Sequence, residues 1–266
     1  MIRALRSLAA PLVVLLGWEA TCRFAHVSPA ILPPPSQVAR KWLEYLLPPQ
    51  PFDGSMSRAA WLVSGDMLHD ACATLLRVLG GFAIGAGLAL PLGLLMGARP
   101  RAYEYLNPLI QMVRPIPPIA FVPLAILWFG LGDPPAFFLI ALGAFFPVLM
   151  NTIAGVRGVD SIYLRAAQNL GASQATLFRR VILPASMPYI LAGLRVGIGV
   201  AFIVVIVAEM IAVNDGLGYR ILEAREYFWS DKIIAGMVTI GLIGLAIDTA
   251  MARLNAHLLR WHRGMA

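Results

Sequence analysis

Residues 157–184, RGVDSIYLRAAQNLGASQATLFRRVILP, form the most informative stretch of the sequence. Residues 160–170 can form one short helix, which Gly171 is expected to end because glycine is unfavourable inside a helix. Ser173 offers a side-chain oxygen that can cap a second helix, and this helix is expected to end near Pro184. The pattern predicts two short helices that meet at an elbow of small side chains, where a partner protein can approach closely.

Long apolar runs lie on both sides of this stretch. A helix needs about 20 mostly apolar residues to cross the hydrocarbon core of a membrane. We expect such spans over residues 1–24, 78–98, 115–132, 134–156, 185–214 and 233–252. The predicted fold class is therefore all-α, a polytopic bundle of six transmembrane helices.

The composition agrees with a chain dissolved in lipid. Of its 266 residues, 59% are hydrophobic and 13% are charged, whereas soluble domains carry about 25% charged residues. The net charge of +7 does not indicate a nucleic-acid partner, because the basic residues form no stripe interleaved with aromatic side chains. Cys22 and Cys72 form no CxxC motif and the four histidines have no metal-ligand spacing, so neither a metal nor another cofactor is expected.

Basic residues are unevenly distributed among the connections between the predicted spans. Eleven arginines and two acidic residues lie on the side that includes residues 157–184, against seven basic and nine acidic residues on the other side. Because cytoplasmic loops carry an excess of Lys and Arg, we expect both termini to lie in the cytoplasm. Glu19 and Arg23 interrupt the place where a signal peptide would be cleaved, so the first run is interpreted as an uncleaved span.

No motif of an enzyme is visible in the sequence. It contains no G-x-x-x-x-G-K-[ST], no H-E-x-x-H and no G-x-S-x-G, so no nucleotide site and no hydrolytic centre are expected. Three G-x-x-x-G pairs are present instead, at residues 81/85, 93/97 and 193/197. Such pairs let helix backbones approach closely in a membrane, and we expect them to serve packing within this chain.

Charged residues inside the predicted spans are candidates for a substrate pathway, because such residues usually face a cavity or a partner. Arg195, Phe202 and Glu209 share one helical stripe, and Arg114 precedes a proline-rich break. We hypothesise that these four residues line the pathway, that the arginines favour an anion and that Glu209 holds a gate. In the alternative interpretation the arginines extend to the inner interface and Glu209 to the outer one. Asp248 is expected to pair with a nearby arginine.

Residues 157–184 resemble the EAA loop of ABC importer permeases, whose pattern is E-A-A, three residues, Gly, nine residues and I-x-L-P. Ala166-Ala167, Gly171 and Leu183-Pro184 match, whereas Arg165 replaces the Glu and Val181 replaces the Ile. The resemblance covers most of the chain and points to the sulfonate, taurine and nitrate branch. The matching stretches are Leu32-Pro33-Pro34-Pro35, Arg114-Pro115-Ile116-Pro117, Trp128-Phe129-Gly130, Ala208-Glu209, Gly216-Leu217-Gly218-Tyr219 and Ala224-Arg225-Glu226-Tyr227.

This resemblance implies the type I importer permease fold, also called MetI-like. It implies uptake of a small anionic solute across the bacterial inner membrane, driven by a cytosolic ATPase dimer that binds the ATP. The other implied partners are a periplasmic or lipid-anchored substrate-binding protein and a second permease copy, as a homodimer. Contact with the ATPase is implied for Arg165, Ala166, Ala167, Gly171, Ala172, Leu183 and Pro184.

The expected organisation has three parts. Residues 1–70 hold the first span and a proline-rich periplasmic segment, residues 71–255 form a five-helix core with the coupling loop, and residues 256–266 form a cytoplasmic tail. Alternative functions are a secondary transporter without an ATPase, for which no inverted repeat is visible, and an integral-membrane enzyme. A permease for another substrate class, such as a thiamine precursor, also stays open.

Overall fold

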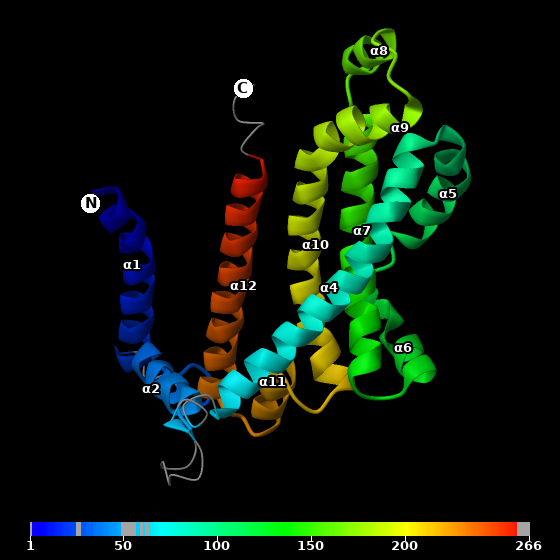
Figure 1. The fold of residues 1–266 in the computed structure, drawn as a ribbon. Coiled ribbons are helices and arrows are strands. Elements are labelled where there is room, and N and C mark those ends of the chain that lie inside the picture. Colours follow the sequence, from blue (N-terminus) through cyan, green and yellow to red (C-terminus); the bar gives the residue numbers. More distant parts are fainter. Residues whose placement is uncertain (1, 25–27, 49–56, 59–60, 62–63, 260–266) are drawn as a thin grey trace. The chain divides into compact units, whose positions relative to one another are not determined.

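The computed structural model describes residues 2–24, 28–48, 57–58, 61 and 64–259, with side chains from residue 9 onward in the first helix. The described residues form helices and no strands (Figure 1). The helices are α1 (Ile2–Phe24), α2 (Pro35–Leu46), α4 (Asp66–Ala98), α5 (Pro100–Val113), η1 (Pro118–Phe121), α6 (Val122–Phe129), α7 (Asp133–Arg157), α8 (Ser161–Asn169), α9 (Gln174–Leu177), η2 (Phe178–Ile182), α10 (Leu183–Ala212), α11 (Leu217–Glu226) and α12 (Ser230–Leu258).

The chain divides into two compact units. The smaller unit comprises residues 1–74 and 214–243, and the larger comprises residues 75–213 and 244–266. Two helices contribute residues to both units. Helix α4 belongs to the smaller unit up to Thr74 and to the larger unit from Leu75, and α12 changes from the smaller to the larger unit after Ile243. The functional division at residues 70/71 and 255/256 stays a prediction, and residues 260–266 of the expected tail lie outside the described residues.

The larger unit is built around α7, which lies beside α10 along its length (Figure 1). Glycines make this packing possible, because a Cβ on Gly85 of α4 would lie 2.3 Å from the carbonyl oxygen of Ala141 on α7. A Cβ on Gly197 of α10 would lie 2.7 Å from Cγ2 of Val148 on α7. All three predicted pairs face α7, which confirms their role in packing within the chain: Gly81, Gly85, Gly93, Gly97, Gly193 and Gly197.

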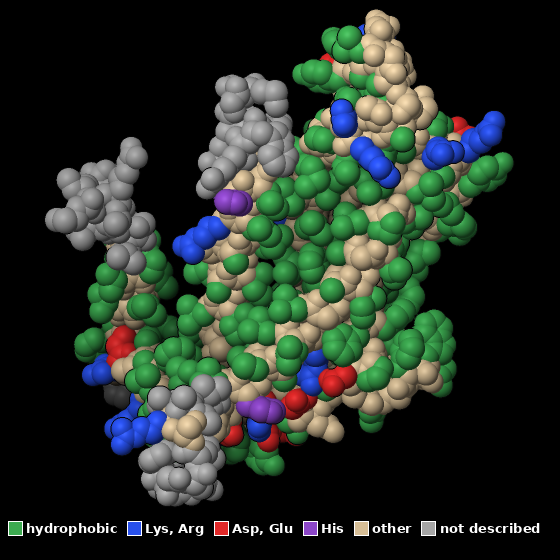
Figure 2. Space-filling model, in the orientation of Figure 1, with side chains coloured by type: hydrophobic (Ala, Val, Ile, Leu, Met, Phe, Trp, Pro, Cys, Tyr) green, Lys and Arg blue, Asp and Glu red, His purple; other side chains and the backbone are tan. Residues whose placement is uncertain are grey.

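Four helices among the described residues are long and apolar enough to cross a membrane. They are α4, α7, the continuous helix Gln174–Ala212 and α12. The helices over Pro100–Val113 and Pro118–Phe129 form a fifth span if the bent pair counts as one. In Figure 2 hydrophobic side chains cover much of the visible face of the larger unit, whereas arginines lie toward the end that carries α8 and α9. These features confirm an all-α membrane protein.

Two of the six expected spans are not among these four helices. Helix α1 forms where the first span is expected, but its first side chains lie outside the described set, so its role as a span stays a prediction. The third span, expected over residues 115–132, is shorter in the structure, since its helical part is Pro118–Phe129 and meets α5 at 81°. Pro115, Pro117 and Pro118 cause the break, since none of them can donate a backbone hydrogen bond.

The smaller unit contains α1, α2, α11, the first part of α4 and the first part of α12. Helix α2 is amphipathic and joins α12 through Trp42, whose Nε1 donates to Oγ1 of Thr239 at 2.8 Å. Thr239 Oγ1 in turn donates to the backbone carbonyl of Ala235, one helical turn earlier. A buried polar contact therefore holds α2 against the apolar surface of α12.

Candidate functional site

The loop between α7 and α10 has the elbow that the sequence predicts. Asp160 caps α8 by accepting a hydrogen bond from the backbone N–H of Ile162 at 2.8 Å. Gly171 follows with φ +79°, a left-handed conformation that glycine adopts without steric cost. Ser173 then caps α9 through the N–H of Thr176 at 3.3 Å. We call α8, α9 and the turn between them the coupling knob.

The second helix of the knob does not end near Pro184, so that expectation is wrong. Helix α9 continues through the π-helical segment η2 into α10, which gives one helix over Gln174–Ala212. The N–H of Leu183 donates to the carbonyl of Phe178, five residues earlier. This wider turn directly precedes Pro184, which lacks an N–H, and lets the helix pass the proline without ending.

The coupling knob exposes apolar side chains to its surroundings. Leu170 at the end of α8 is 88% exposed, and Ile162 and Tyr163 are also exposed. Of the residues expected to contact a partner, Arg165, Ala166 and Gly171 are exposed, whereas Ala167, Ala172, Leu183 and Pro184 are half-buried. No atom lies within 4 Å of a Cβ built on Gly171, so the elbow is open to a partner.

Glu209 lies in a buried ion-pair cluster at the other end of α10. Its Oε1 is 3.0 Å from Nη1 of Arg77 on α4, and its side chain is 0% exposed. Nε of Arg77 also donates to Oδ1 of Asp133, the first residue of α7, at 2.7 Å. Arg77 is 6% exposed and Asp133 is 56% exposed. One guanidinium therefore joins α4, α7 and α10.

Arg195 pairs with Asp248, as expected for that aspartate. Nε and Nη2 of Arg195 each donate to one carboxylate oxygen of Asp248 on α12, both at 2.7 Å. Phe202, one stripe position further along α10, is buried and lies next to Gly244 of α12. The proposed stripe thus contacts α12 through Arg195 and Phe202, and contacts α4 through Glu209. Its place in a pathway stays a prediction.

Arg114 lines a cavity of about 370 Å³ between the bent span, α7 and α10. Its backbone N–H ends α5 by donating to the carbonyl of Ile110 at 2.8 Å. Among the described residues the side chain of Arg114 has no hydrogen bond and no ion pair, and it is the only ionisable group that lines the cavity. The structure does not bring Arg195, Phe202 or Glu209 to this cavity.

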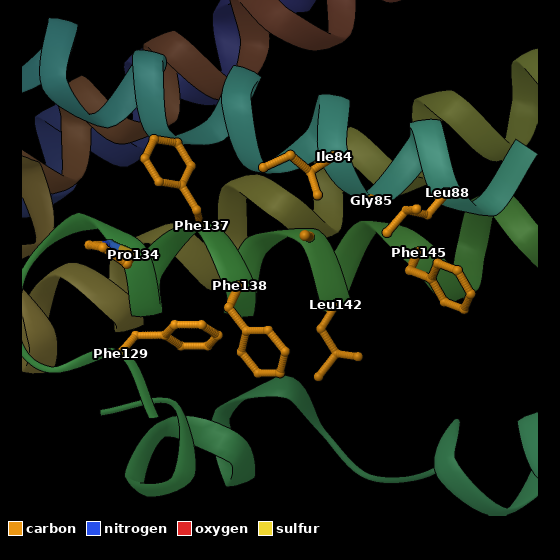
Figure 3. A pocket seen from close by; sticks show the side chains of 10 residues that line it. Ile84, Gly85, Leu88, Phe129, Pro134, Phe137, Phe138, Leu142 and Phe145 are labelled. Atoms are coloured by element: carbon orange, nitrogen blue, oxygen red, sulfur yellow. The ribbon is translucent and has the colours of Figure 1, made fainter. Parts of the chain in front are cut away.

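A larger groove of about 490 Å³ lies between α4, α6 and α7 (Figure 3). Its lining is entirely apolar, and the aromatic rings of Phe129 and Phe138 lie 5.6 Å apart on one wall. Ile84 and Leu88 of α4 line the same groove. With no polar side chain among these residues, the groove offers no contact that would recognise a charged solute.

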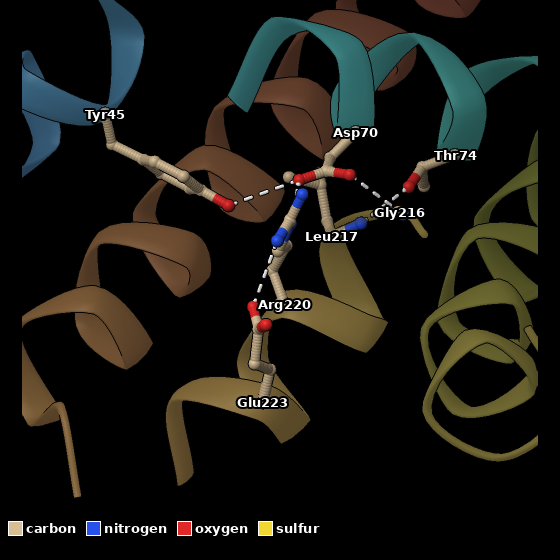
Figure 4. Close-up of polar contacts among 7 residues, drawn as sticks. All are labelled: Tyr45, Asp70, Thr74, Gly216, Leu217, Arg220 and Glu223. Carbon is tan, nitrogen blue, oxygen red and sulfur yellow. Dashed lines mark hydrogen bonds and ion pairs between the residues drawn. The ribbon is translucent and has the colours of Figure 1, made fainter. Parts of the chain in front are cut away.

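Asp70 organises a second buried cluster, in the smaller unit (Figure 4). Its carboxylate accepts hydrogen bonds from the N–H of Gly216 at 3.1 Å, Nε of Arg220 at 2.7 Å and the hydroxyl of Tyr45 at 3.2 Å. Oγ1 of Thr74, one turn along α4, accepts from the N–H of Leu217 at 3.0 Å. Two side chains of α4 therefore cap the beginning of α11.

The protonation states of Tyr45 and Arg220 in this cluster stay fixed at neutral pH. Burial and the nearby carboxylate of Asp70 raise the pKa of the Tyr45 hydroxyl. Burial lowers the pKa of Arg220, but hydrogen bonds to Asp70 and Glu223 outweigh it, so the net shift is upward. The phenol therefore stays neutral and the guanidinium stays charged. Among the described residues, no three His, Cys, Asp or Glu side chains are placed to bind a metal ion.

Sequence reasoning missed Arg77 and the role of Asp70. A signal was present, since Asp70, Thr74 and Arg77 are spaced by four and three residues and so share one face of α4. Polar residues at this spacing beside an apolar span indicate a buried polar contact. Their partners could not be found this way, because Glu209 and Arg220 are more than 130 positions further along the chain.

The chain is similar to known membrane transport proteins. Residues 89–264 match a family model described as "Binding-protein-dependent transport system inner membrane component". The chain is 36% identical over 250 residues to the taurine transport system permease protein TauC of Escherichia coli. This alignment covers 94% of this chain and 87% of that protein. It is 30% identical over 254 residues to the nitrate import permease protein NrtB of Synechocystis, covering 96% and 89%.

A solved structure of the MetNI methionine ABC transporter, in an inward-facing conformation, has the same fold. The match has a TM-score of 0.65 at 17% identity and covers 76% of this chain and 99% of that chain. This likeness confirms the fold expected from the sequence. The family match includes α7, α10, the coupling knob between them and the cavity beside Arg114.

Proposed function

The chain belongs to the family of binding-protein-dependent transport system inner membrane components, and from this membership we propose that it imports a small oxyanion. It is an ABC transporter permease, a membrane subunit that forms a passage for solute. In the proposed system it has no catalytic site, and a cytosolic ATPase dimer binds and hydrolyses the ATP. A substrate-binding protein delivers the solute from outside.

The coupling knob carries the proposal that an ATPase docks on this chain. It lies between two apolar helices, its elbow is open at Gly171, and Leu170 extends from it with 88% of its surface exposed. An exposed leucine beside small residues suits a contact with another protein. Arg165 stands at the position where the family pattern has Glu, so we expect the ATPase surface facing it to be acidic or neutral.

The substrate class is inferred from the relatives and from charge. Relatives that match most of the chain carry names that specify taurine and nitrate, which both contain an oxyanion group. Arg114 lies at the middle of the larger unit and has no acidic partner among the described residues. We therefore propose an aliphatic sulfonate, taurine or nitrate as the solute, with the other partners of the system being a second permease copy and membrane lipid.

The cellular location of the chain is inferred from its apolar helices and from the placement of its arginines. Helices of this length and hydropathy make the chain an integral membrane protein. We propose the bacterial inner membrane, with both termini in the cytoplasm, because the arginine-rich connections mark the cytoplasmic side. The coupling knob then lies in the cytoplasm, where an ATPase can reach it.

Co-purification and uptake test the proposed function. The chain is co-expressed with a candidate ATPase and a candidate binding protein, and the complex is reconstituted in vesicles. We expect ATP-dependent accumulation of labelled taurine, an alkanesulfonate or nitrate, and none with the ATPase omitted. Accumulation that needs an ion gradient and not ATP would contradict the proposal and favour a secondary transporter.

A further inference from the structure

The cavity beside Arg114 lies at mid-depth in the larger unit. Its lining includes residues near the middle of α7, from Leu142 to Asn151, and near the middle of α10, Val196 and Val200. The rest of the lining is apolar except for Asn151, whose Nδ2 donates to the carbonyl of Pro147 at 2.8 Å. Arg114 thus places a cation beside the middle of two apolar spans, where an ionisable residue usually faces a cavity or a partner.

The backbone at this place also requires a polar surrounding. The break between α5 and η1 lies at residues 114–117, and Ile116, Pro117 and Pro118 line the cavity. Non-helical backbone occurs at membrane depth only where it is buried in protein or faces water. The break, the cation and the cavity coincide, which indicates a water-accessible space and not a lipid-facing surface.

The structure distinguishes Arg114 from Arg195, the two arginines that the sequence suggested as candidates for binding an anion. Arg195 is neutralised by two hydrogen bonds to Asp248, so its charge is already compensated. Arg114 has no carboxylate partner among the described residues, and no other ionisable group lines its cavity. A planar guanidinium with unused donors binds the oxygens of sulfonate or nitrate well.

We propose that this cavity is an anion-binding station midway along the passage, in which Arg114 holds one small oxyanion during transport. The proposal rests on the proposed function as a permease. The guanidinium offsets the cost of placing a negative charge at mid-depth, and the described lining holds no carboxylate side chain that would compete for it. A cavity of about 370 Å³ has room for taurine or a short alkanesulfonate with some water.

A labelling experiment tests the station without requiring transport. In a background with Cys22→Ser and Cys72→Ser, Met150→Cys places a thiol in the cavity lining. The thiol is reacted with 2-sulfonatoethyl methanethiosulfonate, which carries a sulfonate, and with the equally sized trimethylammonium reagent. The measured quantity is the ratio of the two reaction rates. Adding Arg114→Gln should lower the anion-to-cation ratio about ten-fold, and Arg114→Lys should largely keep it.

The double variant Arg195→Gln with Asp248→Asn is the matched control, and we expect it to leave the ratio unchanged because it removes both members of a compensated ion pair. An unchanged ratio in Arg114→Gln would overturn the proposal. So would a thiol that neither reagent reaches, since the cavity would then not be open to water.

Uptake measurements separate this proposal from the proposed function. If the wild-type complex accumulates taurine or nitrate, Arg114→Gln should reduce the initial rate about ten-fold while the complex still assembles, as shown by size-exclusion chromatography. Wild-type uptake with an unaffected Arg114→Gln variant would refute the station and leave the permease function intact. Absence of wild-type uptake, together with a charge-sensitive labelling ratio, would refute the proposed function and keep the anion site.

Discussion

Arg77 joins three helices of the larger unit at the end of α10 that lies away from the coupling knob. It is buried, and it contacts the fully buried Glu209 and the half-exposed Asp133. A buried ion pair adds little net stability compared with a well-packed apolar pair, but removal of one partner is costly. The cluster is therefore sensitive to single substitutions, and these substitutions reveal which carboxylate depends on the guanidinium.

We expect Arg77→Met to lower the free energy of unfolding by about 3–5 kcal/mol, because it leaves Glu209 charged, buried and without its guanidinium. The readout is the thermal unfolding midpoint of the purified protein in detergent. Asp133→Asn is the matched control and should cost much less, since the exposed carboxylate is already solvated.

The double variant Arg77→Met with Glu209→Gln should recover much of the loss, because the uncompensated charge is gone. A double variant no more stable than Arg77→Met would show that the arginine acts through packing and not through the charge of Glu209.

Single residues also show how far the sequence alone can be interpreted. Glu209 could be selected because an acid inside an apolar span is costly, and a partner contact could be expected for it. Asp248 could be paired with an arginine by the same reasoning, and the structure places Arg195 there. Arg77 had a local signal in its spacing from Asp70 and Thr74, but its partner Glu209 lies 132 positions further along and could not be found this way.

Helix α4 approaches α7 so closely that a single methyl group decides whether the two helices fit. A Cβ on Gly85 would lie 2.3 Å from a backbone carbonyl oxygen of α7, and backbone cannot move aside as a flexible side chain can. Gly87, two residues further along the same helix, has no atom within 4 Å of a Cβ. The two positions thus form a natural comparison.

We predict that Gly85→Ala lowers the free energy of unfolding by about 1–3 kcal/mol, the usual cost of overpacking a tight interface. Gly87→Ala should be neutral or slightly stabilising, because alanine favours helix more than glycine does. Thermal unfolding in detergent and the yield of monodisperse protein measure both effects. Equal stability of the two variants would contradict the close approach of α4 and α7.

The coupling knob permits a similar comparison for function. Leu170→Asp should abolish co-purification with the ATPase without lowering the unfolding midpoint, because the side chain is 88% exposed and packs little within the chain. Gln168→Glu, also on α8, adds a negative charge at an exposed position and should keep most of the binding. Loss of binding in both variants would indicate a general charge effect, not a contact made by Leu170.

Helix ends could be predicted from the sequence where capping side chains and glycines within a few residues determine them. Asp160, Gly171 and Ser173 mark the knob because capping oxygens and a left-handed glycine act within a few residues. The helix was expected to stop near Pro184, but the π-helical segment lets it continue, and such a segment leaves no signature in the sequence. The break after Arg114 was expected from the prolines that follow it, but the 81° angle between α5 and the next helices was not.

For the chain as a whole, the orientation in the membrane is the prediction with the widest consequences. Both termini are expected in the cytoplasm, with six spans in total. A reporter active only in the cytoplasm should be active when fused after residue 263, and a reporter active only in the periplasm should be active when inserted between residues 25 and 70. A C-terminus outside the cytoplasm would reverse the placement of the knob and refute the proposed coupling.

The fold and the family followed from patterns spread over the whole chain, namely apolar runs, arginine placement and the loop pattern at residues 157–184. The setting of Arg114 did not, because its cavity forms only when the bent span, α7 and α10 come together. The sequence offered two arginines for an anion, and the geometry leaves one with its charge uncompensated.

The continuous helix Gln174–Ala212 has a mechanical consequence. At 1.5 Å per residue its 39 residues make a rod about 58 Å long, with the coupling knob at one end and Glu209 near the other. If an ATPase docks on the coupling knob as proposed, the backbone hydrogen bonds of this helix carry a displacement from the knob toward Glu209. The Arg77–Glu209 ion pair then resists movement of that end of the helix relative to α4.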